Sequence, residues 1–370
     1  MRVESLSLRS FRNYEEEQIA FHPGINLILG MNAQGKTNLL EAVTYLSAGH
    51  AFRTRKEKDL ISFGADFADL SATVFTHERL MELRAVLFAS RRPRQLFLNG
   101  VKQKTFGENM AGQLMSVLFC PEDLSILKEG GAGRRRLMDT ALCQLRPRYE
   151  EILTEYNRLL EHKSRILKDW HEDRSLLQLL PDFNERMCRL GAEMISVRAA
   201  YLDALAALAR DYHREFSGDS EQLEIQYRSV SNIPDVRDDK IKLYASLKEH
   251  MHSHERAELE SGQCLSGPHK DDFETYLNGA EIKSYGSQGQ TRTAAISLKL
   301  AQREIFRKDS GEEPVLLLDD VLSELDCRRQ DFILNHLRTG QVIITCCETD
   351  RFTDVGKMFT VEKGTVKEVG

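Results

Sequence analysis

Two short segments at opposite ends of the 370-residue chain contain the residue types that bind a nucleoside triphosphate. The first is a glycine-containing loop, Gly30-Met31-Asn32-Ala33-Gln34-Gly35-Lys36-Thr37. Backbone N–H groups of such a loop surround phosphate oxygens, its lysine reaches the β and γ phosphates of ATP, and its threonine hydroxyl binds Mg²⁺. The second is the carboxylate pair Asp319-Asp320. We expect Asp319 to hold the same Mg²⁺ through water.

The residues around both segments predict the elements that position them. An apolar run from Ile25 to Leu29 precedes the loop, and apolar residues at helical spacing follow it, so the loop is expected between a strand and a helix. The apolar run from Val315 to Leu318 predicts a buried central strand in front of the two carboxylates. This strand makes a solvated surface pair of carboxylates the weaker interpretation.

A third segment, Ser287-Gln288-Gly289-Gln290, opens a predicted helix. A serine and a glycine at a helix start leave N–H groups that can accept an anion, although the segment taken alone is more simply an ordinary helix cap. Its place before the acidic strand is that of the signature of ATP-binding-cassette ATPases, which contacts the γ-phosphate held by the opposite subunit. The segment Ser323-Glu324-Leu325-Asp326 likewise resembles the D-loop of that superfamily.

The long stretch of chain between the glycine-containing loop and the carboxylate pair predicts a second domain. Strands are expected at residues 70–75, 83–88 and 95–98, and Asn-Gly pairs at 99–100 and 278–279 predict two hairpins that flank the insertion. We expect an ATPase head assembled from residues 1–122 and 262–370, with a mainly helical domain inserted over residues 123–261.

The inserted region has apolar residues mostly at three- and four-residue steps. They predict long helices over residues 149–170 and 187–212, joined by a turn near Pro181. The pair would form either an antiparallel, coiled-coil-like arm or a compact lobe packed on the sheet. A strand at 223–227 and a helix from Asp238 to Glu260 are expected to follow.

Composition is that of an ordinary globular protein, with 41% hydrophobic and 29% charged residues and a net charge of -6. The seven cysteines are scattered without a Cys-x-x-Cys pair, which favours a reduced, cytoplasmic protein and no metal site of that kind. Cys346 and Cys347 are adjacent, but neighbours on a strand point to opposite faces. No apolar run is long enough to span a membrane.

Six segments together resemble the RecF family of bacterial recombination mediators, relatives of the SMC head domains. They are Leu8 to Tyr14, Gly30 to Asn38, His50 to Arg53, Gly267 to Asp272, Gly286 to Gln290 and Leu317 to Asp326. The resemblance implies an α/β fold: an ABC-type P-loop ATPase head of mixed sheets with flanking helices, plus the inserted α-helical arm or lobe.

The resemblance also implies roles for individual residues. Asn32 to Thr37 would bind the triphosphate, Asn13 would lie near the adenine, and Ser287, Gln288 and Gly289 would meet ATP across a dimer. Asp320 occupies the position of the glutamate base in transporter-type relatives, so together with Lys36 it is the expected catalytic residue. Because aspartate is shorter, we expect slow hydrolysis. Residues 346–350 contain no histidine where many cassette ATPases have one, which leaves the γ-phosphate sensor unassigned.

Basic residues form three clusters that could neutralise DNA phosphates. We expect DNA contacts from the first two clusters, Arg53, Arg55 and Lys56, and Arg91, Arg92 and Arg94. A solvated or ion-paired surface is the alternative for each, and Arg53 has a second alternative at the ATP site. The third cluster, Arg134 to Arg136, has the alternative of orienting the inserted domain through carboxylates.

The function implied is that of an ATP-dependent DNA clamp in recombinational repair, replication restart and the SOS response. ATP would join two copies of the chain on junctions between single- and double-stranded DNA, and the clamp would cooperate with RecR and RecO in loading RecA at gaps. Two alternatives remain: an ATPase subunit that drives a membrane transporter, and an enzyme that transfers phosphate to a small molecule. The long helical insertion argues against the first, and the Ser287 segment against the second.

Overall fold

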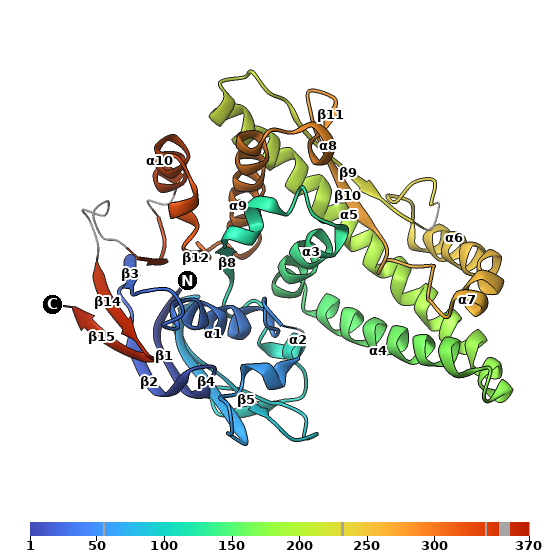
Figure 1. Cartoon of the computed structure of the whole chain (residues 1–370), viewed down its shortest axis with the longest axis horizontal. Helices are drawn as coiled ribbons and strands as arrows, with labels where there is room; N and C mark the ends of the chain where they lie inside the picture. The colour runs from blue at the N-terminus through green and yellow to red at the C-terminus, as the bar shows by residue number, and fades with distance from the viewer. Residues whose placement is uncertain (55, 231–232, 337–338, 348–355, 370) are drawn as a thin grey trace. The chain divides into compact units, whose positions relative to one another are not determined.

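The computed structural model describes residues 1–54, 56–230, 233–336, 339–347 and 356–369. These residues form two compact units. The first contains residues 1–125, 143–147 and 295–370, and the second contains residues 126–142 and 148–294. Figure 1 labels most of the helices and strands of both.

The first unit contains two sheets, each of six strands in the described part of the chain. One is antiparallel and runs in the order β2 (Tyr14–Ala20), β1 (Arg2–Phe11), β4 (Phe67–Thr76), β5 (Arg79–Phe88), β6 (Gln95–Leu98), β7 (Val101–Gln103). The other runs in the order β15 (Thr365–Val369), β14 (Lys357–Glu362), β3 (Ile25–Leu29), β13 (Val342–Cys346), β12 (Val315–Asp319), β8 (Ser116–Phe119).

The burial of the strands follows from these two topologies. Buried residues alternate with half-buried ones along β4, as expected for an antiparallel strand with one face on the core. Every residue of β12 is buried, because β12 is a central strand flanked by parallel β13 and β8. Strands β3, β13 and β12 are parallel, so their carboxyl ends lie along one edge of the sheet.

Helix α1 (Lys36–Ala48) lies between the two sheets. It contacts β4 and β5 on one side and β8, β12 and β13 on the other, and nearly all its side chains are buried. A helix covered on two sides is expected to be apolar around its circumference, as in its run of leucine, alanine and valine. The remaining helices of this unit are α2 (Phe106–Asn109), α10 (Cys327–His336), and the short 3₁₀ helices η1 (Glu57–Leu60), η2 (Pro121–Ser125) and η4 (Val321–Glu324).

The second unit is mainly helical. Its elements are α4 (Pro147–Asp169), η3 (Arg174–Leu179), α5 (Leu180–Ser217), α6 (Lys240–Ser253), α7 (Glu255–Ser261), α8 (Ile282–Tyr285), β9 (Leu223–Arg228), β10 (Asp272–Leu277) and β11 (Ala280–Glu281). Two further helices, α3 (Gly131–Leu145) and α9 (Gln288–Ser310), include residues of both units. Helix α5 packs on α6 and on β9, so this long helix is covered by several elements of its unit.

Most of the expected elements are present, with differences in detail. Both Asn-Gly pairs form turns, with Asn99 and Asn278 at φ of 49° and 50°. Pro181 lies within the first turn of α5, where its missing N–H costs no hydrogen bond, so the link between the long helices lies before it. The helix expected from Asp238 to Glu260 is interrupted at His254, which separates α6 from α7.

The boundary between the parts of the chain also differs from the expected one. The sequence predicts residues 262–294 in the head, whereas the structure groups them with the second unit. The reason is β10, which pairs antiparallel with β9 from Asp272 opposite Arg228 to Leu277 opposite Leu223. Strand pairing between distant segments is a tertiary contact that leaves no local signal.

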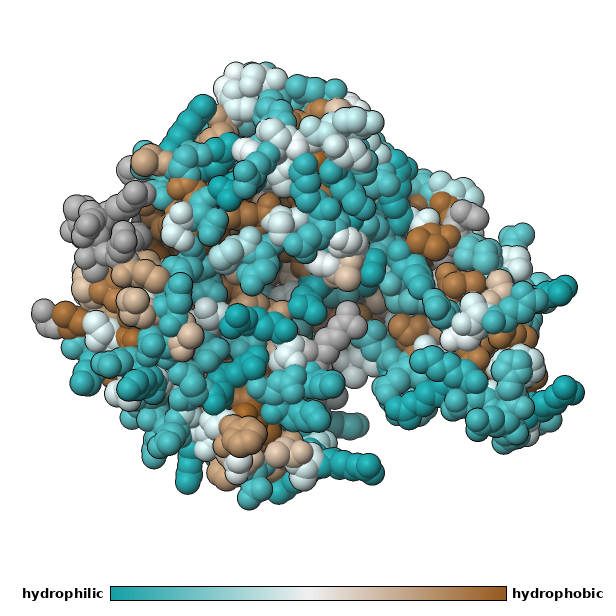
Figure 2. Space-filling model, in the orientation of Figure 1, coloured by the Kyte–Doolittle hydropathy of each residue, from teal (hydrophilic) through white to brown (hydrophobic). Residues whose placement is uncertain are grey.

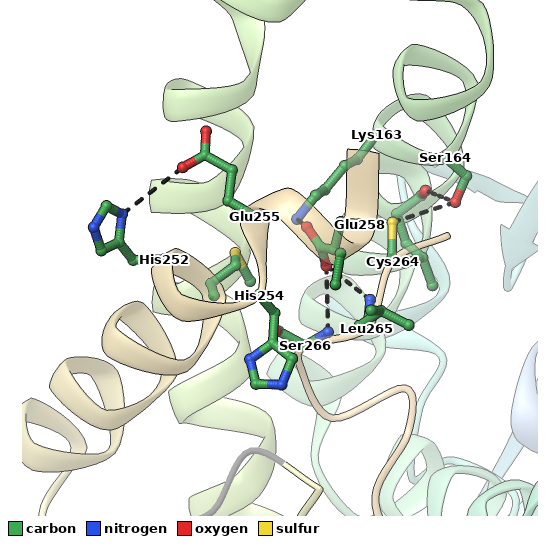
Figure 3. A network of polar contacts seen from close by, with 12 residues as sticks. Lys163, Ser164, His252, His254, Glu255, Glu258, Cys264, Leu265 and Ser266 are labelled. Atoms are coloured by element: carbon green, nitrogen blue, oxygen red, sulfur yellow. Dashed lines mark hydrogen bonds and ion pairs between the residues drawn. The ribbon is translucent and has the colours of Figure 1, made fainter. Parts of the chain in front are cut away.

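A buried ion pair connects helices α4 and α7 of the second unit (Figure 3). Lys163 Nζ of α4 lies 2.6 Å from Glu258 Oε2 of α7, and both side chains are almost fully buried. Glu258 Oε1 also accepts a 2.7 Å hydrogen bond from the N–H of Leu265. Such a pair is strongly destabilising when one partner alone is removed, because the other charge is left uncompensated.

The face shown in Figure 2 is largely hydrophilic, with apolar residues in small scattered groups. Within the described ranges, no helix has the length and apolar character that a membrane span requires.

Candidate functional site

The glycine-containing loop lies between β3 and α1, as the sequence predicts. Gly35 caps α1 with φ of 118°, and a Cβ there would lie 2.6 Å from the Asn13 side chain. A glycine is therefore required both by backbone conformation and by space. Ala33 also has a positive φ, of 64°.

Asn13 holds the loop from the turn between β1 and β2. Its Nδ2 donates to the carbonyl oxygen of Gln34 at 2.8 Å, and its Oδ1 accepts from Asn38 Nδ2 at 2.7 Å. The neighbouring Tyr14 hydroxyl donates to the carbonyl oxygen of Gly35 at 2.9 Å. The segment expected near the adenine therefore shapes the loop directly.

Lys36 is the first residue of α1, and its side chain is 5% exposed. Its ammonium group donates to the carbonyl oxygen of Gly30 at 2.6 Å and lies 3.6 Å from Asp320 Oδ2. These acceptors hold the extended lysine along the loop, where an ammonium can reach a phosphate.

Thr37 and Asp319 meet although they lie far apart in sequence. Thr37 Oγ1 donates to Asp319 Oδ1 at 2.8 Å, and Thr345 Oγ1 donates to the same oxygen at 2.8 Å. Burial raises the pKa of Asp319 above its ordinary value, and the two threonine hydrogen bonds act in the opposite direction. One hydroxyl and one carboxylate at this separation are oxygen donors of the kind that Mg²⁺ prefers.

Asp320 adopts a left-handed backbone conformation, with φ of 53°, at the start of η4. Its N–H donates to the Thr345 hydroxyl oxygen at 3.0 Å, and its carbonyl oxygen accepts from Ser323 Oγ at 2.6 Å. A non-glycine residue in this region costs about 1–3 kcal/mol of backbone strain. The surrounding hydrogen bonds keep its carboxylate on the side of Lys36.

Sequence reasoning missed Cys347, which follows β13. Its Sγ lies 3.1 Å from Lys36 Nζ, 3.3 Å from Asn32 Oδ1 and 4.0 Å from Asp320 Oδ2. The available signal was its position directly after an apolar strand, next to a segment without histidine. The thiol belongs to the site because the carboxyl ends of β3, β12 and β13 share one edge.

Ser287 and its neighbours belong to the second unit and begin α9. The N–H of Gln290 donates to Ser287 Oγ at 3.2 Å, and the N–H of Ser287 donates to Gln290 Oε1 at 2.9 Å. This reciprocal pair is a capping box. It leaves Ser287 and Gln288 exposed at the helix start and Gly289 half-buried beside them.

The basic residues of the first unit have different surroundings. Arg53 is exposed and lines a depression of about 600 Å³ together with Asn13 and Asn38, which places it on the side of the glycine-containing loop. Lys56 is exposed nearby, and Arg55 lies outside the described residues.

Arg91 and Arg92 are exposed, but Arg94 is only half-buried and is engaged within the unit. Arg94 Nη1 donates to Glu57 Oε1 at 2.7 Å, to the Tyr45 hydroxyl oxygen at 3.1 Å and to the carbonyl oxygen of Gly49. Its guanidinium group therefore has an internal role that the sequence pattern does not distinguish from its neighbours.

The third basic cluster is also used internally. Arg134 is buried and forms a paired interaction with the Asp272 carboxylate, with distances of 2.8 and 2.7 Å. Arg135 donates to the carbonyl oxygen of Asp271 at 2.7 Å. Both contacts are made within the second unit, and that of Arg134 is with a carboxylate.

Comparisons with known proteins identify the family to which the chain is related. Residues 2–368 match the family described as RecF/RecN/SMC N terminal domain. A DNA replication and repair protein RecF from Clostridium novyi is 36% identical, with 100% of both chains covered. That of Acetivibrio thermocellus is 35% identical, with 95% of both chains covered.

Solved structures give the same result. A structure of the recombination mediator protein RecF-ATPrS in the RecFOR pathway has a TM-score of 0.91 at 33% identity, and the match covers 100% of this chain and 98% of that one. An SMC head domain from Pyrococcus furiosus, 18% identical with a TM-score of 0.55, shares the fold. The ABC-type head fold is thereby confirmed, and the full-length relatives do not favour a transporter subunit. This chain belongs to the RecF family of DNA replication and repair proteins.

Proposed function

We propose that the chain is an ATP-dependent DNA clamp of recombinational repair and replication restart. In this proposal, ATP joins two copies of the chain on DNA at junctions between single and double strands, and hydrolysis releases them. The clamp cooperates with RecR and RecO in loading RecA at single-strand gaps and supports the SOS response, in the cytoplasm.

The observation that carries the proposal is the division of the expected ATP-binding residues between the two units. Lys36, Thr37, Asp319 and Asp320 come together in the first unit, whereas Ser287 lies in the second. In the proposed dimer, Ser287 and Gly289 of one copy meet the ATP held by Lys36 of the other. The exposed capping box gives Ser287 a free hydroxyl side and α9 a positive end for an anion.

Thr37 and Asp319 are the residues that would hold Mg²⁺. When bound, the ion neutralises phosphate charge during transfer. Thr37 and Thr345 keep the Asp319 carboxylate oriented toward the loop through their hydrogen bonds.

Asp320 is the proposed base that accepts a proton from the attacking water. Its hydrogen-bonded backbone holds the carboxylate near Lys36, which itself binds the γ-phosphate. The expected hydrolysis is slow, which suits a switch that controls how long the protein stays on DNA.

Exposed basic groups of the head are the proposed DNA contacts. Arg91, Arg92 and Lys56 carry this role, while Arg53 is proposed to act at the nucleotide because it lines the depression beside Asn13. Arg94 supports Arg91 and Arg92 indirectly, because it is paired with Glu57 inside the head.

The test is sedimentation of the wild-type chain, Lys36→Arg and Ser287→Arg, each with ATP, Mg²⁺ and a gapped DNA. Wild type is expected to form a dimer on DNA. Lys36→Arg is expected to lose nucleotide binding and the dimer together. The Lys36 side chain is only 5% exposed, and the wider guanidinium group does not fit the space that it occupies. Ser287→Arg is expected to bind ATP and stay monomeric. A wild type that remains monomeric at saturating ATP, with and without DNA, contradicts the clamp.

A further inference from the structure

The capping box that presents Ser287 is continued by two more polar side chains into the second unit. Gln290 Nε2 donates to Glu221 Oε1 at 2.8 Å, and Glu221 Oε2 lies 2.9 Å from His213 Nε2. Glu221 lies between α5 and β9, and His213 lies in the last part of α5. All four residues, from His213 to Ser287, belong to the same unit.

The donors and acceptors along this chain of contacts have one consistent assignment. A carboxylate accepts only, so Glu221 requires the NH₂ end of the Gln290 amide on its side. The carbonyl end of Gln290 must then face the N–H of Ser287, and the 2.9 Å contact between them agrees with this orientation. Glu221 thereby sets the direction of the amide that caps the signature helix.

His213 contacts the other carboxylate oxygen of Glu221, and this contact assigns the hydrogen on the imidazole in the same way. The imidazole is fully buried, with Nε2 on the carboxylate, so Nε2 carries the hydrogen and donates it. In the described part of the chain, Nδ1 has no hydrogen-bond partner. A buried N–H at Nδ1 would be costly, which favours the neutral ring. Burial also lowers the pKa of His213 from its ordinary value, although the Glu221 hydrogen bond opposes this.

We propose that Glu221 and His213 are positioning residues for Ser287, acting through the Gln290 amide. The inference rests on the proposed function, because Ser287 matters for dimerisation only if it meets the partner's ATP. His213, in the last part of the long helix α5, and Glu221, after it, thereby determine whether the start of α9 is ordered for binding the nucleotide. The carbonyl oxygen of Gly286 is held independently by Lys128 Nζ at 2.5 Å, so the loop has a second restraint on its other side.

Exchanging the two side chains provides the test. Gln290→Glu alone places two carboxylates against each other, and like charges at hydrogen-bond distance repel. Glu221→Gln alone leaves one amide to face two donors, so either Gln290 or His213 loses its acceptor. In the double variant Glu221→Gln/Gln290→Glu every group is paired again: the carboxylate at 290 accepts from Ser287 and from the amide at 221, whose oxygen accepts from His213. Glu224→Gln, on β9, is the matched control for the loss of a carboxylate.

Three measurements are made on the full chain. Binding of a fluorescent ATP analogue at monomeric concentrations is expected to be unchanged in every variant, because the loop at Lys36 is untouched. The ATP concentration for half-maximal dimerisation is expected to rise at least roughly tenfold in Gln290→Glu and about threefold in Glu221→Gln, and to return within about twofold of wild type in the double variant. Hydrogen exchange of a peptide covering residues 286–291, without nucleotide, is expected to follow the same order.

The outcomes separate this inference from the proposed function. If wild type dimerises and neither single variant changes the ATP requirement, the positioning role is overturned. It is also overturned if the two single effects add in the double variant. If Gln290→Glu does not fold, Glu221→Gln and the double variant decide the question. If wild type does not dimerise, the clamp proposal fails, and the exchange measurement alone decides whether Glu221 orders the start of α9.

Discussion

Thr37 Oγ1 donates a 2.8 Å hydrogen bond to Asp319 Oδ1, across 282 positions of sequence. The bond joins the start of α1 to the end of β12 and brings the two ends of the chain into one site. Lys36 directly precedes Thr37 and Asp320 directly follows Asp319, and Lys36 Nζ lies 3.6 Å from Asp320 Oδ2.

Asp320→Asn is expected to lower ATP turnover about a hundredfold, since positioned proton transfer contributes a factor of about 10²–10⁴. The ATP-bound dimer is expected to persist, because the amide keeps the shape of the carboxylate. Phosphate release at saturating ATP measures the first effect and sedimentation the second. Asp331→Asn, at an exposed position of α10, is the control. Unchanged turnover in Asp320→Asn would remove this residue from catalysis.

Alkylation of the wild-type chain with N-ethylmaleimide is expected to weaken ATP binding on the order of tenfold or more, because exposed thiols react and an adduct on Cys347 fills the space beside Lys36. Cys347→Ser is expected to bind ATP normally and to resist the treatment. Cys327→Ser removes another exposed thiol and is expected to stay sensitive. Equal loss of binding in all three proteins would show that the reactive thiol lies elsewhere.

Stability is expected to fall as the pH decreases from about 6.5 to about 4, in part because of His269. Burial lowers the pKa of His269 from 6.5 to about 4, with the Cys264 carbonyl opposing this. The unfolded chain therefore binds the proton more readily in this window, so the contribution of His269 is complete above the unfolded pKa and is lost as the pH falls through the window. The neutral ring is satisfied on both sides, by the Tyr156 hydroxyl at 2.8 Å and the Cys264 carbonyl oxygen at 3.2 Å.

The size of this effect is at most about 3–4 kcal/mol, from a free energy of about 1.4 kcal/mol for each pKa unit. Urea unfolding at several pH values measures it in wild type and in His269→Gln. The variant is expected to be less stable at pH 7.5 and to lose less stability on acidification. His252→Gln removes a histidine that is 88% exposed and is expected to follow wild type. Parallel pH curves for wild type and His269→Gln would contradict the assignment.

The arginines of the second basic cluster are expected to separate into two roles. Arg94→Ala is expected to cost about 1–3 kcal/mol of folding free energy, because Glu57 and Tyr45 lose their donor. Arg91→Ala/Arg92→Ala is expected to leave stability unchanged. It should reduce the slope of DNA affinity against salt concentration by about 2, close to one for each phosphate contact.

Thermal unfolding and DNA binding at a series of salt concentrations distinguish these roles. DNA affinity that is undiminished in the Arg91/Arg92 double variant would exclude this surface as a DNA contact.

The sequence alone determined the parts of the molecule whose signals are local. The loop from Gly30 to Thr37, the strand before Asp319 and the Asn-Gly turns each depend on neighbouring residues, because turn conformation and strand burial are set within a few positions. Residues far apart in sequence also lie together where a known family pattern supplied the pairing, as it did for Thr37 and Asp319.

Only the tertiary structure decided which side chains meet across distant segments. Cys347 lies beside Lys36 because β3 and β13 are neighbouring parallel strands, and Arg94 is half-buried because it pairs with Glu57. Residues 262–294 belong to the second unit because β10 pairs with β9, and Gln290 is linked to His213 through Glu221. Each of these contacts depends on strand order and helix packing, which a run of adjacent residues does not encode.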